Sequence, residues 1–219
     1  MIFSISSIYS QAEKRTNKDE SIVPGKRQRA KSRVSGTITA MQSRSFASLL
    51  ASGDRRSIGR SNEVAAAVLR QPDSFPELLR CMWSDDPVLR MRAADAVEKI
   101  SVSRPKLLQP YRAELMGLAE EASQQELRWH LALMIPRLQL AAADRRRAME
   151  TLRRYLDDPS SIVKTCAIQG LTELSRGNKA MEAEMVELLE NFCATGTAAM
   201  KARSRKLLTE LQRKKDSPG

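Results

Sequence analysis

One apolar pattern that recurs four times constrains the fold of this chain more than any other feature. Starting at Leu89, apolar or small residues follow four, seven, eight and eleven positions later, and these positions share one side of an α-helix. The four stripes comprise Leu89, Ala93, Ala96, Val97 and Ile100; Leu127, Leu131, Met134, Ile135 and Leu138; Val163, Ala167, Gly170, Leu171 and Leu174; and Met200, Ser204, Leu207, Leu208 and Leu211. Four stripes in one register, spaced 36 to 38 residues apart, indicate an internal repeat.

The segments between the stripes have the pattern of further helices, and none shows the alternation that is typical of strands. The partner helices are expected near 75–84, 106–121, 142–156 and 179–193, with shorter helices before them near 45–52 and 61–70. Because one antiparallel hairpin cannot bury its own stripe, the hairpins must stack on one another. The sequence therefore predicts an all-α fold of about four helical hairpins with an N-terminal capping unit.

Two of the striped segments resemble the second helix of HEAT repeats. "DDPVLRMRAADAV" (85–97) and "DDPSSIVKTCAIQGL" (157–171) have that family's acid and proline, followed by aliphatic, basic and small residues. "QQELRWHLALMI" (124–135) and "TAAMKARSRKLL" (197–208) resemble it less, since both lack the Asp-Pro entry. The resemblance covers about residues 61–212. It implies a right-handed α-α superhelix, a HEAT-like solenoid of the armadillo-like type.

The net charge of +11 is concentrated at the two ends of the chain. Residues 1–60 carry 12 Lys and Arg against 4 Asp and Glu, residues 61–200 carry 18 against 20, and residues 201–219 carry 7 against 2. A basic tail is more often a solvated appendage than a binding site, although it attracts polyanions at low salt. The charge alone therefore does not assign a nucleic-acid function.

Composition divides the chain into three parts. Residues 1–45 are expected to be a disordered basic tail, and a second interpretation is that the native protein starts at Met41. The HEAT-like repeat domain is expected over 46–212, followed by a basic polar tail over 213–219. There is no apolar run long enough to span a membrane, and the three cysteines lie far apart in the sequence. These features favour reduced thiols and a cytoplasmic protein.

A first candidate site lies opposite the apolar stripe, on the side of the striped helices that commonly lines the concave surface of a solenoid. Trp129, Leu133 and Pro136 form its one wholly apolar set, and Met91 and Asp95 occupy matching positions one repeat earlier. An aromatic anchor in a groove is typical of a binding hot spot. The alternative interpretation is that a neighbouring helix buries this side, and the sequence leaves both open.

Two basic features are further candidates. The residue after the first position of each stripe is basic, and we name this set the basic ladder: Arg90, Arg128, Lys164 and Lys201. In HEAT-like repeats the resemblance implies that this position bonds acids and backbone carbonyls between neighbours, so a structural role is favoured over ligand binding. The loop "RRSIGRS" places Arg55, Arg56 and Arg60 beside a helix start, where arginines and backbone N–H groups suit an anion.

Residue types for catalysis are scarce. The chain has one histidine, His130, and three scattered cysteines, so no His/Cys zinc cluster is expected, and it lacks the phosphate-binding, dinucleotide and nucleophile-elbow glycine motifs. We therefore expect no catalytic residues, no metal, no cofactor and no small-molecule substrate. The sequence favours a non-enzymatic scaffold or adaptor that binds a protein partner through its concave face.

The alternative function is a nucleic-acid-binding HEAT-like protein, including the alkyl-base DNA glycosylase type. In that class the resemblance implies an aromatic residue and an acid beside the extruded base, parts that Trp129 and Asp95 would take. The basic ends of the chain would add affinity for phosphate.

Overall fold

The computed structural model describes residues 45–54 and 57–216, and all regular structure within these ranges is helical, which confirms the all-α class. The chain divides after Ser45, and its second unit, Phe46–Gly219, is compact. The predicted tail over 1–45 lies outside the described residues, apart from Ser45. All the helices described below belong to the second unit.

The helices follow one another in pairs after a short first section. That section contains α3 (Phe46–Ala51), α4 (Ser61–Arg70) and the 3-10 turn η1 (Pro72–Ser74). The pairs are α5 (Phe75–Arg80) with η2 (Cys81–Trp83) and α6 (Pro87–Ser103); η3 (Pro105–Tyr111) and α7 (Arg112–Glu121) with α8 (Gln125–Met134) and η4 (Ile135–Arg137); α9 (Ala142–Arg154) with η5 (Tyr155–Asp157) and α10 (Ser161–Ser175); and α11 (Lys179–Thr195) with α12 (Ala198–Asp216).

The helix α12 continues beyond the predicted end of the repeat domain. The sequence suggested a basic polar tail from residue 213, but the helix extends to Asp216. Arginine and lysine are good helix formers, and nothing in "QRKKD" interrupts the hydrogen bonding of the preceding turns. The polar character of a segment was therefore not enough to end the helix there.

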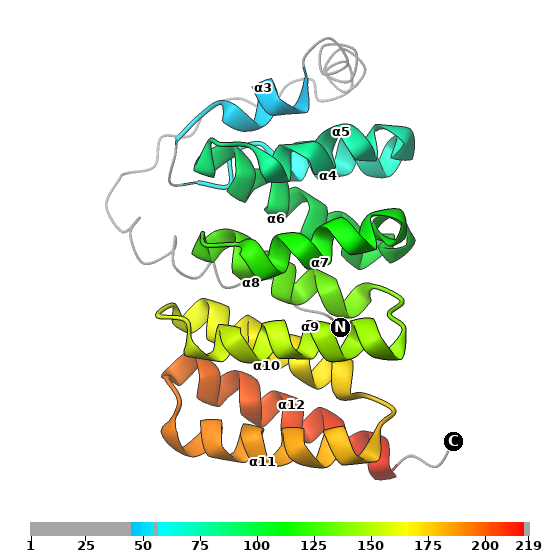
Figure 1. Ribbon diagram of the computed structural model, residues 1–219. Coiled ribbons are helices and arrows are strands. Elements are labelled where there is room, and N and C mark those ends of the chain that lie inside the picture. The colour runs from blue at the N-terminus through cyan, green and yellow to red at the C-terminus, as the bar shows by residue number, and fades with distance from the viewer. Residues whose placement is uncertain (1–44, 55–56, 217–219) are drawn as a thin grey trace, which may run out of the picture. The chain divides into compact units, whose positions relative to one another are not determined.

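The striped helices contact one another in chain order. The helices α4, α6, α8, α10 and α12, which we call the inner helices, each contact the next, and the four pairs α5–α6, α7–α8, α9–α10 and α11–α12 are also in contact. Figure 1 shows the helices of this unit in successive layers, from α3 and α4 at one end to α11 and α12 at the other. The inner helices therefore contact one another in sequence throughout this unit.

The apolar stripes form the core between these layers. Ile100, Leu131 and Leu171 are fully buried, as are most other stripe residues, while Leu89 and Leu208 are half-buried. Small residues set the spacing between helices: a Cβ added at Gly170 of α10 would lie only 2.5 Å from the carbonyl oxygen of Ala132 in α8. The two backbones are thus too close for any side chain at that position.

A buried arginine ties the first helices to α6. Arg92 is fully buried, and its guanidinium donates to the carbonyl oxygens of Leu50, Ser52, Asp54 and Ser57. Carbonyls at the end of a short helix lack intrahelical partners, and a guanidinium with five N–H donors satisfies several of them at once. This role of Arg92 had no signal in the sequence beyond an arginine next to a run of alanines.

Candidate functional site

The side of α8 that was a candidate groove is covered. Trp129 is 3% exposed and Leu133 is 5% exposed, and Pro136 lies against Gly170 of α10. Of the matching residues on α6, Met91 is half-buried and Asp95 is 7% exposed. The interpretation of this side as an open groove is therefore wrong, because the next inner helix packs closely enough to bury it.

Asp95 is a structural acid that joins two inner helices. Its carboxylate accepts hydrogen bonds from the hydroxyl of Ser61 in α4 and from the ammonium of Lys99 one turn away. Lys99 Nζ also donates to Asn62 Oδ1 over 2.6 Å. A buried charge is costly unless it is paired and hydrogen-bonded, and these contacts supply both conditions. Asp95 is thus not directed at an external ligand.

A second buried acid joins α6 to the end of α8. Arg137 Nη2 donates to Glu98 Oε1 over 2.7 Å, and its Nη1 donates to the Glu98 carbonyl oxygen and to Ser101 Oγ. The side chains of Arg137 and Glu98 are 14% and 2% exposed. This pair extends the line of polar contacts between neighbouring inner helices, and it too is closed to solvent.

The single histidine is buried and neutral. His130 lies beside Trp129, with ring centroids 5.7 Å apart, and its Nδ1 atom has no hydrogen-bond partner among the described residues. Burial lowers the pKa of His130 to about 4, although the nearby Asp95 opposes this shift. Burial likewise raises the pKa of the Cys166 thiol to about 12, so neither side chain is prepared for acid–base or nucleophilic chemistry at neutral pH.

The first two members of the basic ladder, Arg90 and Arg128, form hydrogen bonds between neighbouring layers of helices. Arg90 Nε donates to Gln124 Oε1 over 2.7 Å, and Arg128 Nη1 donates to Asp158 Oδ2 over 2.5 Å. Each guanidinium also donates to a backbone carbonyl oxygen, Arg90 to that of Ser84 over 2.9 Å. Both arginines therefore bridge the boundary to the next inner helix.

The last two members of the ladder have no such partners. Within residues 57–216, the ammonium groups of Lys164 and Lys201 make no hydrogen bond or ion pair. Counted back from the first stripe residue, Gln124 corresponds to Thr197 and Asp158 corresponds to Thr195. Both threonines are short and uncharged, so neither position presents an acid to Lys164.

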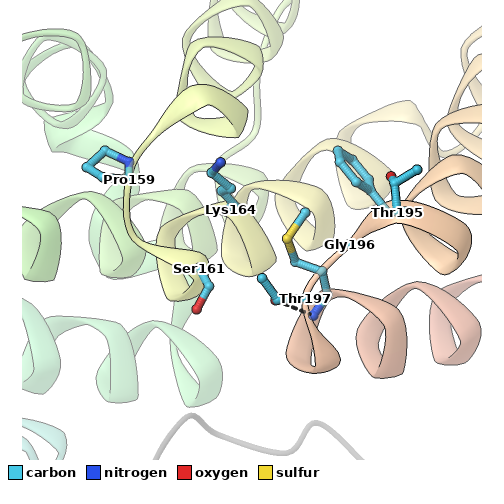
Figure 2. A pocket seen from close by; sticks show the side chains of 8 residues that line it. Pro159, Ser161, Lys164, Thr195, Gly196 and Thr197 are labelled. Atoms are coloured by element: carbon cyan, nitrogen blue, oxygen red, sulfur yellow. Dashed lines mark hydrogen bonds between the residues drawn. The ribbon is translucent and has the colours of Figure 1, made fainter.

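A pocket opens beside Lys164, between the start of α10 and the turn from α11 to α12 (Figure 2). It has a volume of about 270 Å³. Its lining combines a cation, three hydroxyls and apolar groups, contributed by Pro159, Ser161, Lys164, Phe192, Thr195, Gly196, Thr197 and Met200. We call it the Lys164 pocket.

The polar groups of the Lys164 pocket differ in how they are used. Thr195 Oγ1 donates to the Asn191 carbonyl oxygen over 2.9 Å, and Thr197 Oγ1 accepts from the Met200 N–H over 3.4 Å (Figure 2). The Ser161 hydroxyl makes no hydrogen bond within the described part of the chain. Lys164 and Ser161 thus remain available to a ligand in the pocket.

The candidate anion loop is only partly described. Arg55 and Arg56 lie outside the described residues. Arg60 donates through Nη2 to Glu63 Oε2 over 2.7 Å, and this exposed pair lies within the first turn of α4. Arg60 is therefore already paired with a carboxylate of its own helix, and a pair this exposed contributes little to stability.

A second hollow lies on the partner helices, beside the end of α7. Its volume is about 540 Å³, and Glu120, Arg147 and Arg154 are among the residues that line it. Arg147 donates to both carboxylate oxygens of Glu120, over 2.5 and 2.6 Å, and this contact lowers the pKa of Glu120. Glu120 and Arg147 in this hollow thus bond to each other and not to a ligand.

The exposed tryptophan is not the one that the sequence singled out. Trp83, in η2, is 45% exposed, whereas Trp129 is buried. The difference in burial comes from the tertiary structure and not from the residue type.

Neither a scan against protein-family models nor a search of curated proteins finds a match for this chain. Among the described residues, no three His, Cys, Asp or Glu side chains gather as they would around a metal ion. None of the described helices combines the length and the hydropathy that crossing a membrane requires.

Proposed function

We propose that the second compact unit is a HEAT-like solenoid, a right-handed α-α superhelix of the armadillo-like type. The contacts of each inner helix with the next support this arrangement. Side-chain bonds also join residues about one repeat apart: Arg90 reaches Gln124 and Arg203 reaches Gln169, both over 34 positions. Bonds between neighbouring units are expected when repeat units stack.

We infer that this array is a non-enzymatic scaffold that binds a protein partner, without a metal or cofactor. The observation that carries the inference is the contrast in how polar groups are used. Buried polar side chains such as Asp95, Glu98 and Arg92 bond to other helices of the same chain. Lys164 and Lys201 lie at the surface without partners in the described residues. The cations left for recognition are thus surface groups, not parts of an enclosed site.

We place this scaffold in the cytoplasm. The three cysteines, Cys81, Cys166 and Cys193, are all free thiols, and the first two are buried. Free thiols spread through a helical core are typical of proteins in a reducing compartment.

Nucleic-acid binding is the second candidate function, and one observation favours it. The helix α12 carries Lys201, Arg203, Arg205, Lys206 and Arg213 along one segment of the chain. Basic residues clustered on a helix attract phosphate. The case for a DNA glycosylase is weaker. Its aromatic residue and its acid would be Trp129 and Asp95, and both are buried.

Two measurements on the full chain distinguish the candidates. The first is a fluorescence-anisotropy titration with duplex and single-stranded DNA at low and at near-physiological salt. The second is cross-linked affinity capture, followed by sedimentation of the chain with each purified partner. A scaffold forms a protein complex of fixed stoichiometry and loses DNA as salt rises. DNA binding that survives physiological salt, with no protein complex, would contradict the proposal.

A further inference from the structure

We propose that the Lys164 pocket binds a carboxylate of an acidic protein segment, a Glu or Asp side chain of the partner. The inference rests on the proposed scaffold function and gives that function a recognition site. It is argued from three observations: the pattern of the basic ladder, the lining of the pocket, and the charge of the helix that forms one wall.

Comparison with the first two members of the basic ladder indicates which chemical group is missing beside Lys164. At the boundary after α6 the ladder arginine meets the carboxamide of Gln124, and at the boundary after α8 it meets the carboxylate of Asp158. At the boundary after α10 the ladder residue Lys164 meets neither, since threonines occupy the two corresponding positions. The group that would complete the pattern is a carboxylate or carboxamide, and a positive ladder residue favours the carboxylate.

The lining suits an acidic side chain with its apolar stem. The Lys164 ammonium and the Ser161 hydroxyl offer donors, and Phe192 and Met200 add apolar surface to the lining. A Cβ added at Gly196 would lie 2.6 Å from the Phe192 carbonyl oxygen and 2.9 Å from the Met200 Cβ, so only glycine fits in this wall of the pocket. The volume of about 270 Å³ exceeds the space that one carboxylate needs and admits part of its backbone.

The surroundings favour a short acidic segment over a nucleic acid. The end of α11 forms one wall of the pocket, and this helix carries Glu182, Glu184, Glu187 and Glu190 against a single Lys179. A phosphate backbone brings a charge at every nucleotide, so it meets more repulsion along this helix than a segment with one or two carboxylates does. One or two carboxylates bind the lysines without extending over α11.

Lys201 extends the site by one ladder position. It follows Met200, which lines the pocket, and it is half-buried and without a partner among the described residues. A segment with two acids can therefore pair the first with Lys164 and the second with Lys201. Two lysines at successive ladder positions favour a segment with two acids over an isolated acid.

The test is a peptide-binding assay with the full chain. The probes are immobilised twelve-residue peptides of Leu, Phe and Ser that each carry two Asp or Glu residues, and the same set with Asn or Gln in place of each acid. We expect the acidic set to bind about tenfold more tightly than the amide set, since charge-assisted bonds are the stronger kind. Lys164→Gln should weaken binding of the acidic set about fivefold or more.

Lys179→Gln is the matched control, because Lys179 is exposed at the opposite end of α11 and the charge change is identical. It should leave peptide affinity within about twofold of the unmodified chain. Both variants should retain the circular-dichroism signal of the helices and the thermal midpoint of the unmodified chain. Neither lysine side chain makes a hydrogen bond or ion pair within the described residues.

The outcomes separate the two proposals. Peptide or partner binding that is unaffected by Lys164→Gln would overturn the pocket while leaving the scaffold function in place. Absence of any binding by the acidic set would overturn the pocket as well. DNA binding at near-physiological salt that is lost in Lys164→Gln would assign the pocket to phosphate and overturn the carboxylate proposal.

Discussion

Two inner helices, α10 and α12, present the same face of the repeat in opposite environments. Thr172 of α10 and Thr209 of α12 occupy the same register, and each hydroxyl donates to the carbonyl oxygen four residues earlier in its own helix. Thr172 is fully buried, while Thr209 is exposed. The difference shows that a following inner helix, and not the residue type, decides whether this face is core or surface.

The same contrast extends along both helices. At the register of the candidate groove, α10 presents Thr165 and Gln169, which are buried and half-buried, whereas α12 presents Ala202 and Lys206, which are exposed. A helix face that meets water is usually polar, and the exposed Lys206 of α12 follows this rule. The predictions below test this division into closed layers and an open last layer.

The largest expected effect comes from placing a charge on the shared face. Thr172→Asp should lower the free energy of unfolding by about 3 kcal/mol, because it buries an unpaired carboxylate. Thr209→Asp, the same change at the same register, should alter it by less than about 0.5 kcal/mol. Urea denaturation followed by circular dichroism measures both values. Equal losses in the two variants would mean that the face of α12 is covered.

Acid should destabilise the closed layers through His130. Its pKa in the folded state is about 4, below its value of 6.5 in an unfolded chain, so the unfolded state binds the proton more tightly. The stability that a neutral His130 allows is fully present above pH 6.5 and is lost as the pH falls toward 4. The free energy of unfolding then decreases by about 3 kcal/mol. Urea denaturation at several pH values measures this slope.

His130→Leu is the control for the pH prediction, because it keeps an apolar side chain of similar size and removes the titration. Asp and Glu residues titrate in both proteins, so the difference between the two slopes isolates the histidine. At the same register α12 has Arg203, which is half-exposed and bonded to Gln169. Identical pH slopes in both proteins would contradict the burial of a neutral His130.

Substituting two members of the basic ladder should have a smaller effect on the free energy of unfolding. Arg128→Ala should cost about 2 kcal/mol, because it leaves the Asp158 carboxylate, 2% exposed, without its cation. Lys164→Ala should change the free energy of unfolding by less than about 0.5 kcal/mol, since that ammonium has no partner in the described residues. Thermal denaturation of both variants would show whether the two boundaries differ. A large loss in Lys164→Ala would give that lysine a structural role.

The smallest effect comes from supplying the missing acid. Thr195→Asp places a carboxylate at the position that corresponds to Asp158 and should stabilise the fold by about 0.5 kcal/mol through Lys164. It should also compete with acidic peptides for the pocket. In a Lys164→Gln background the gain should disappear, which a double-mutant cycle measures. A gain that persists without Lys164 would show that the new acid acts elsewhere.

Much of the fold could be predicted from the sequence, because stripe periodicity reports on helices directly. The four stripes are largely buried in the structure, and helices occupy the expected intervals. The candidate site was less accessible to such reasoning. Trp129 was assigned to a groove or a core with equal support, because a pattern within one helix contains no information on how closely the next helix approaches.

The sequence by itself determined the all-helical class, the helix boundaries to within a few residues, and the register that relates one unit to the next. Tertiary structure alone decided which polar side chains form hydrogen bonds and ion pairs within the protein. Arg92, Asp95 and Glu98 found partners on other helices, and Lys164 did not. Periodicity depends on local backbone geometry, whereas the pairing of charges depends on distances between segments far apart in the chain.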